Sequence, residues 1–380
     1  MECPTESPKP KITWKTVLFP IVGLAAFFAY IYIFQVDILA IIATAQRADP
    51  FPYALAVALS LLEVFFFSVS WRVLVNFLLI KLSVIKSYLF VWYGIFVDIL
   101  VPAESVSGEA LRVYLITKEQ GNDTCGRVVA SLVTHRLLGM GLNVVVLILG
   151  MGLLFTETTI DPLIFNLILF LAVGITATLL LMIFFSFKEK WSLKVIDWVI
   201  RLGKFLSRGK WHWQLTKIKE DACRIAKSFH DSMKEFKHNP KALVFSLFYL
   251  AVTWIFSLSV PYLVFISLRY PVSWSVILIT SAIVLAIKSI PLGIPFEVGL
   301  PEITMTTVYI SLLGPAAAGI SATATILTRL ITLWLRFFIG FIAQQWLELK
   351  TVAPANGISA EKPKITLSPS LFHDRHGDKD

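Results

Sequence analysis

Long apolar runs separated by short polar stretches follow one another along most of the chain, from residue 17 to residue 347. Several runs reach the roughly 20 residues that a helix needs to cross a hydrocarbon core of about 30 Å. The alternating pattern of a membrane β-barrel is absent from the sequence. Because a backbone in lipid must satisfy its own hydrogen bonds, the runs predict an all-α polytopic membrane protein, with about six full transmembrane helices and two re-entrant helical hairpins.

Composition agrees with this class and distinguishes one segment. The 380 residues are 57% hydrophobic and 16% charged, which is far from the balance of a soluble domain. Lys and Arg gather in 188–241, where Trp191, Val195 and Trp198 recur at helical spacing. The segment either lies on the inner leaflet as an amphipathic helix that meets anionic lipids, or forms a cytoplasmic helical hairpin packed on itself.

The apolar runs and the positive charges predict five segments. These are a cytoplasmic N-terminus, a first membrane half, a basic cytoplasmic segment, a second membrane half and a disordered cytoplasmic tail. The expected boundaries are 1–16, 17–187 with a re-entrant hairpin near 87–118, 188–241, 242–347 with a re-entrant hairpin near 273–313, and 348–380. Following the charges makes the two hairpins enter from opposite sides of the cell (plasma) membrane. This predicts an inverted repeat, an arrangement in which transporters place a substrate site near the bilayer midplane.

Two stretches, 102–136 and 295–329, look like copies of one device. Each begins at a proline, carries glutamates at the second and seventh positions after it, and ends at an arginine that follows the second glutamate at the same spacing in both copies. One constant offset along the chain relates every matching pair. The pairs are Pro102 and Pro295, Glu104 and Glu297, Glu109 and Glu302, and Arg136 and Arg329.

The four glutamates cannot face lipid, because a charge at the centre of a membrane helix costs about 2.5 to 3.5 kcal/mol on insertion scales. One interpretation is structural, with Glu109 paired to Arg136 and Glu302 paired to Arg329. The other is functional: cations at this depth bind an anionic headgroup, while the carboxylates switch partners or couple to protons. The predicted substrate-binding residues are Arg112, Arg136, Arg329 and Lys288, and the predicted switching residues are Glu104, Glu109, Glu297 and Glu302.

Glycine and proline in the two stretches are expected to break helices, expose helix N-termini and let the backbone approach a ligand. The predicted hairpin breaks are Pro102, Gly108, Pro291, Pro295 and Gly299. Glu63 lies in another apolar run, where a contact with a neighbouring helix and a functional role are both open.

The sequence contains no metal-ligand cluster, nucleophile motif, P-loop or nucleic-acid module. We therefore expect no cofactor, no metal and no nucleic-acid partner, and a transporter rather than an enzyme. A membrane-embedded transferase or hydrolase with a glutamate as general base is an alternative. A third is a non-transporting subunit of a lipid or glycan synthesis complex.

Three stretches resemble the signatures of the lysylphosphatidylglycerol synthase transmembrane-region family, which is also described as flippase-like. They are Gly108-Glu-Ala-Leu-Arg112, Thr134-His-Arg136-Leu-Leu-Gly139 and Pro291-Leu-Gly-Ile-Pro295-Phe-Glu-Val-Gly299-Leu-Pro-Glu302, within a resemblance that covers roughly 15–345. The resemblance implies the membrane part alone, without the soluble aminoacyl-transfer domain. It also implies movement of a lipid between leaflets, such as an aminoacylated phospholipid or a polyprenyl-phosphate-linked sugar.

The chain departs from the family pattern at both hairpins. His135 stands where a glutamate is usual, Phe296 and Glu297 replace a glycine pair, and Glu104 and Ser105 replace small residues. These tips are bulkier and more acidic than the family pattern, so we expect a substrate that differs from that of relatives.

Overall fold

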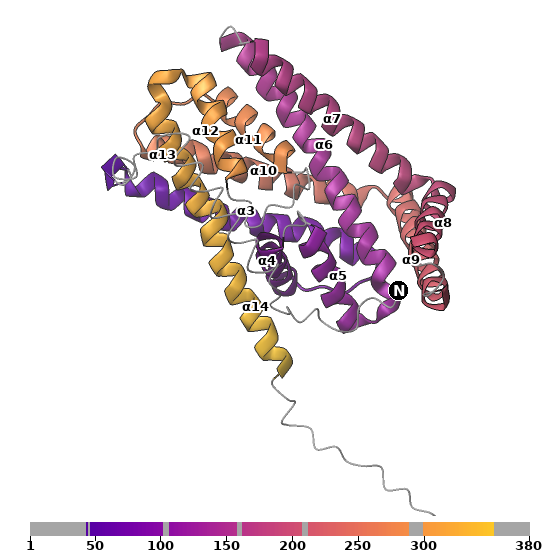
Figure 1. Cartoon of the computed structure of the whole chain (residues 1–380). Coiled ribbons are helices and arrows are strands. Elements are labelled where there is room, and N and C mark those ends of the chain that lie inside the picture. The colour runs from indigo at the N-terminus through magenta and orange to yellow at the C-terminus, as the bar shows by residue number, and fades with distance from the viewer. Residues whose placement is uncertain are drawn as a thin grey trace, which may run out of the picture.

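The computed structural model describes residues 43–44, 46–101, 106–157, 162–206, 212–288 and 299–352, and the regular structure in these ranges is helical throughout (Figure 1). The helices are α3 (Pro50–Phe77), α4 (Val84–Leu100), α5 (Val106–Gln120), α6 (Cys125–Glu157), α7 (Pro162–Phe187), α8 (Glu189–Leu206), α9 (His212–His238), α10 (Lys241–Ser267), α11 (Trp274–Lys288), α12 (Leu300–Leu313), α13 (Ala318–Arg329) and α14 (Arg336–Val352). Two short 3₁₀ helices, η1 (Asn122–Thr124) and η3 (Pro315–Ala317), precede α6 and α13, and a π-helical segment, η4 (Leu330–Leu335), joins α13 to α14.

Four described helical stretches are long and apolar enough to cross a membrane: Pro50–Phe77, Asn122–Leu153, Lys241–Ser267 and Pro315–Glu348. A fifth candidate is the pair formed by α7 and α8, which is bent by 96°. The all-α polytopic prediction is confirmed. The expected first span near residues 17–34 lies outside the described residues, and the number of spans and their orientation stay predictions.

Two sets of helices share one order of elements. The N-terminal set consists of α3 to α6 and the C-terminal set of α10 to α14. Gly121 and Gly314, which are related by the same offset as Arg136 and Arg329, have φ angles of 93° and 91°, a region that glycine enters without steric cost. Each leads into a 3₁₀ helix and then a long helix. Leu79 and Arg269 have positive φ angles at equivalent places, just after α3 and just after α10.

The two sets interlock through close helix crossings. The helices α3 and α10 pack side by side at the centre (Figure 1), where the Oγ atoms of Ser70 and Ser246 lie 2.8 Å apart. In addition, α6 packs on α11 and α14 packs on α4. At the second crossing a Cβ on Gly340 would lie 2.7 Å from the carbonyl oxygen of Trp92. Small residues permit this approach, as is usual between membrane helices.

The basic segment forms two helices, α8 and α9, that lie together at the end of α7 (Figure 1). Two ion pairs join them: Lys219 Nζ to Asp197 Oδ1 at 2.8 Å and Lys234 Nζ to Glu189 Oε2 at 3.6 Å. The two helices therefore form a hairpin, which also packs on α6, and its cytoplasmic placement stays a prediction. Several apolar side chains on one face of α8 are nevertheless exposed, as Trp198 is by 63%. This exposed apolar face of α8 is the one that the amphipathic-helix interpretation would place against the inner leaflet.

Candidate functional site

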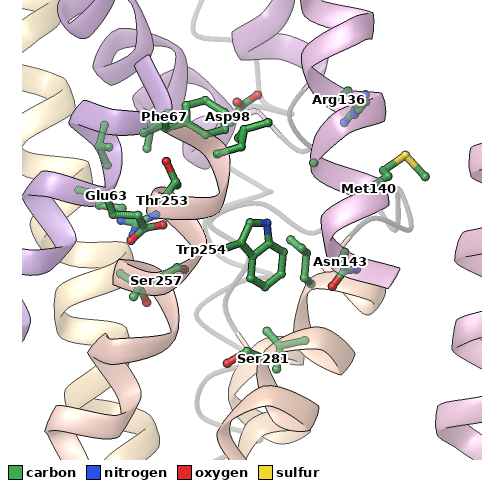
Figure 2. A pocket seen from close by; sticks show the side chains of 18 of the residues that line it. Glu63, Phe67, Asp98, Arg136, Met140, Asn143, Thr253, Trp254, Ser257 and Ser281 are labelled. Atoms are coloured by element: carbon green, nitrogen blue, oxygen red, sulfur yellow. The ribbon is translucent and has the colours of Figure 1, made fainter. Parts of the chain in front are cut away.

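A cavity of about 660 Å³ lies between the two sets of helices, with part of α7 on its wall. Figure 2 shows side chains of α3 and α10 on one side and of α6 on the other, with Trp254 reaching between them. Such a volume suits a small ligand or a lipid headgroup. The charged side chains that line it are Glu63, Asp98, Glu109, Arg112, Arg136, Arg329 and Arg336.

Matching positions of the two sets line this cavity. Each lining helix of the N-terminal set has a counterpart in the C-terminal set, and within each such pair of helices the matched positions keep one constant offset along the chain. The matched lining pairs are Glu63 and Thr253, Val64 and Trp254, Phe67 and Ser257, Val91 and Ser281, Ile95 and Leu285, Arg112 and Met305, His135 and Thr328, Arg136 and Arg329, Gly139 and Thr332, and Asn143 and Arg336. The cavity is therefore bounded by equivalent faces of both sets.

Glu302 and Arg329 form a buried ion pair within the C-terminal set. Arg329 Nε lies 2.6 Å from Glu302 Oε1, and the two side chains are 7% and 4% exposed, the arginine first. The second carboxylate oxygen of Glu302 accepts the backbone N–H of Gly299 at 2.7 Å, which caps α12. A carboxylate that accepts two hydrogen bonds at a helix N-terminus is held firmly. This pair has the geometry that the structural interpretation expects.

The equivalent pair in the N-terminal set is looser. Arg136 Nη1 lies 3.6 Å from Glu109 Oε2, and their side chains are 34% and 23% exposed. Both residues line the cavity. At this distance the two groups attract each other without a short hydrogen bond, so either one can turn toward a ligand at little cost.

A third ion pair joins the two sets. Arg336 Nη2 lies 2.5 Å from Glu63 Oε2 and 3.3 Å from Ser60 Oγ. Sequence reasoning missed Arg336, although it follows Arg329 by about two helical turns and so shares a face with it. The π-helical segment between the two arginines is of a kind frequently found at functional sites.

Asp98, also missed from the sequence, fixes the start of α5. Its Oδ1 accepts the Ser107 hydroxyl and the Gly108 backbone N–H, each at 2.6 Å. Gly108 is the third residue of α5 rather than a break in the chain. A Cβ at Gly108 would collide with the Asp98 carboxylate and the Gly94 carbonyl. The lack of a side chain at Gly108 therefore allows α4 and α5 to approach each other closely.

Arg112 is the most deeply placed predicted cation of the N-terminal set. It is 6% exposed, its Nε donates to the Gly108 carbonyl at 3.3 Å, and its guanidinium lies 5.2 Å from the centre of the Trp71 ring. Its Nη1 is buried without a hydrogen-bond partner among the described residues. Because a buried donor left unpaired costs about 1 to 3 kcal/mol, or more when it is charged, this nitrogen needs an acceptor.

Other unpaired polar atoms gather in the same cavity. In the described part of the chain, six buried side-chain atoms without a hydrogen-bond partner belong to residues that line it. They are Arg112 Nη1, His135 Nε2, Asn143 Oδ1, Thr280 Oγ1, Thr328 Oγ1 and Arg336 Nε. Buried groups of this kind are normally satisfied by a ligand or by ordered water. Residues of the cavity wall therefore carry both donors and acceptors that lack a protein partner among the described residues.

The structure thus brings Arg112, Arg136 and Arg329 to one cavity, with Glu109 on the same wall. Gly299, with φ of 97°, is the N-cap residue of α12. Lys288 ends α11, and its side chain is outside the described atoms. The predicted residues Pro102, Glu104, Pro291, Pro295 and Glu297 lie outside the described residues.

Comparison with known proteins identifies the family. The model of the lysylphosphatidylglycerol synthase transmembrane region matches residues 18–340. The chain belongs to this family. Two archaeal relatives are similar along most of their length. The UPF0104 membrane protein PH1989 of Pyrococcus horikoshii is 25% identical over 302 residues, 78% of this chain and 87% of that protein. The UPF0104 membrane protein MJ1595 of Methanocaldococcus jannaschii is 26% identical over 340 residues, 88% of this chain and 95% of that protein.

No solved structure is significantly similar to the chain. Family membership makes this a multi-pass membrane protein of a lipid-related family, in agreement with the apolar helices.

Proposed function

We propose that the protein is a flippase-like transporter that moves an anionic lipid or a polyprenyl-phosphate-linked sugar between the leaflets of the cell membrane. The observation that carries the proposal is the buried, unpaired guanidinium nitrogen of Arg112 in a cavity between two equivalent sets of helices. Guanidinium groups bind phosphate oxygens through strong charge-assisted hydrogen bonds.

The arrangement of the helices supports transport in particular. In the proposed topology the two sets are inverted repeats, each with a re-entrant hairpin, and both chain termini are cytoplasmic. A cavity lined by matching positions of two such repeats can open to either side when one repeat rocks against the other. The Glu63–Arg336 pair, which joins the sets, is a contact that such a motion would break.

The two repeated ion pairs receive different roles in this proposal. The buried Glu302–Arg329 pair anchors α12 and α13, whereas the looser Glu109–Arg136 pair opens when a headgroup enters. In the proposal Arg136 then joins Arg112 on the phosphate, and Glu109 is released to switch partners or take up a proton. Glu104, Glu297 and Lys288 are proposed to act near the same site.

The test is lipid translocation in proteoliposomes. We would compare the wild type with Arg112→Gln and with Lys118→Gln, which removes an exposed cation from the same helix. We expect Arg112→Gln to reduce translocation of an anionic fluorescent lipid at least tenfold, and Lys118→Gln to leave it unchanged. Equal translocation by all three proteins would reject the site. Formation of a new lipid product in detergent, where no leaflets exist, would favour the enzyme class instead.

A further inference from the structure

Among the described residues, each carboxylate that lines the cavity has a partner. Glu63 is bonded to Arg336, and Glu109 lies beside Arg136. Asp98 accepts two hydrogen bonds at the start of α5. A cationic group that entered the cavity would have to compete with Arg336 for Glu63 or with the two donors to Asp98, whereas Glu109 belongs to the looser pair.

The cationic side of the lining keeps free hydrogen-bonding capacity. Among the described residues, Arg112 Nη1 and Arg336 Nε are buried donors without a partner. Both belong to guanidinium groups that line the cavity. The lining therefore suits a ligand that brings a negative group with acceptor oxygens.

A different set of side chains lines the region around Trp254. Figure 2 shows the indole of Trp254 extending from α10 toward Asn143 on α6, with Ser257 of α10 and Ser281 of α11 among the other lining side chains. These residues are uncharged. Asn143 is 3% exposed with Oδ1 unpaired in the part of the chain that the structure describes. Thr280, the residue before Ser281, lines the same cavity and is fully buried with Oγ1 unpaired there.

The unpaired Asn143 oxygen discriminates between ligand chemistries. A carbonyl oxygen accepts hydrogen bonds and donates none, so it needs a donor. An ionised phosphate has acceptor oxygens and supplies no donor. Hydroxyl groups both donate and accept, and therefore match Asn143 and Thr280 together. The flat apolar face of an indole with a polar edge suits a sugar ring, which is apolar on its faces and polar at its rim.

We propose that the cavity has two subsites, a phosphate subsite at Arg112 and a neutral hydroxyl-binding subsite formed by Asn143, Thr280 and Trp254. The ligand is accordingly a lipid with a glycosyl phosphate headgroup. This inference rests on the proposed function, because it names the substrate class of the same cavity.

The test compares three probes on the purified full-length protein in nanodiscs: a polyprenyl phosphate, its glucosyl ester and lysylphosphatidylglycerol. Dissociation constants would be measured by native mass spectrometry. We expect the glucosyl ester to bind about tenfold more tightly than the phosphate alone, as two added hydrogen bonds would provide. Lysylphosphatidylglycerol, which carries no sugar, is expected to bind more weakly than the glucosyl ester.

Variants separate the two subsites. Asn143→Leu and Thr280→Val should bring the ratio of the dissociation constants of the polyprenyl phosphate and its glucosyl ester to near one. Both variants should leave the dissociation constant of the polyprenyl phosphate unchanged. Arg112→Gln should weaken both polyprenyl probes equally and keep their ratio. Thr178→Val is the matched control, because Thr178 also lines the cavity but its hydroxyl already donates to the Gly174 carbonyl at 2.9 Å. In Thr178→Val the ratio of the dissociation constants of the two polyprenyl probes should equal that of the wild type.

The outcomes distinguish this inference from the function on which it rests. Equal binding of the two polyprenyl probes to the wild type, with both weakened by Arg112→Gln, would overturn the hydroxyl subsite and keep the transporter proposal. Tighter binding of lysylphosphatidylglycerol would overturn the subsite in the same way. No binding of any probe would overturn both.

Discussion

The two repeated ion pairs offer a controlled comparison of burial. Glu302 Oε1 and Arg329 Nε lie 2.6 Å apart, and the two side chains are 4% and 7% exposed. Glu109 Oε2 and Arg136 Nη1 lie 3.6 Å apart, and these side chains are 23% and 34% exposed. The spacing along the chain is the same within both pairs. The perturbation is therefore the same at both sites: glutamate to glutamine, arginine to glutamine, and both together.

The magnitudes follow from the environment of each pair. Removing one member of a buried pair leaves an uncompensated charge and costs about 3 to 5 kcal/mol. Glu302→Gln also weakens the cap on the Gly299 N–H, which places it toward the upper end of that range. At the looser pair the solvated groups contribute about 1 kcal/mol or less. The double substitution at Glu302 and Arg329 should cost less than the sum of its single substitutions, because no lone charge is left buried.

Equilibrium unfolding of the purified variants in mixed detergent micelles measures these differences. We expect Glu302→Gln and Arg329→Gln to lower the free energy of unfolding at least threefold more than Glu109→Gln and Arg136→Gln. Equal losses at the two sites would refute the assignment of an anchoring role to one pair and a switching role to the other.

Three further predictions concern other contacts. Gly108→Ala should destabilise the protein by about 1 to 3 kcal/mol, measured by the same unfolding assay, because its methyl group would collide with the Asp98 carboxylate; an unchanged stability would contradict the close packing of α4 on α5. Glu63→Gln should loosen the contact between the two sets of helices and speed maleimide labelling of Ser281→Cys at least severalfold, whereas unchanged labelling would show that the Arg336 bond does not restrain the two sets. We also propose that α8 lies on the anionic inner leaflet, since it turns by 96° from α7 with its apolar face exposed; a spin label at Val199 should then be accessible to oxygen and shielded from a water-soluble nickel complex, and the reverse accessibility would place it in water.

The sequence predicts the parts of the site that depend on spacing. The constant offset between the two stretches recurs in the backbone at Gly121 and Gly314, and it brings Arg136 and Arg329 to one cavity. The apolar runs likewise predict the helical class, because the requirement for internal hydrogen bonds leaves little choice of structure in lipid.

The remaining parts depend on tertiary contacts between distant helices. The Glu63–Arg336 bond joins two helices that are far apart along the chain, and a π-helical segment precedes the arginine, which no local pattern announces. Asp98 becomes a helix cap only through the packing of α4 against α5. Asn143 and Thr280 read as ordinary polar residues of membrane helices until the cavity shows that their oxygens are unpaired among the described residues.

Mass spectrometry of the lipids that co-purify with the protein tests the central claim most directly. The wild type would be compared with Arg112→Gln and with Lys118→Gln, all extracted from the same cells. The proposed headgroup site predicts one class of anionic lipid, enriched over the bulk membrane in the wild type and in Lys118→Gln and lost from Arg112→Gln. A lipid profile equal to that of the bulk membrane in all three proteins would contradict it.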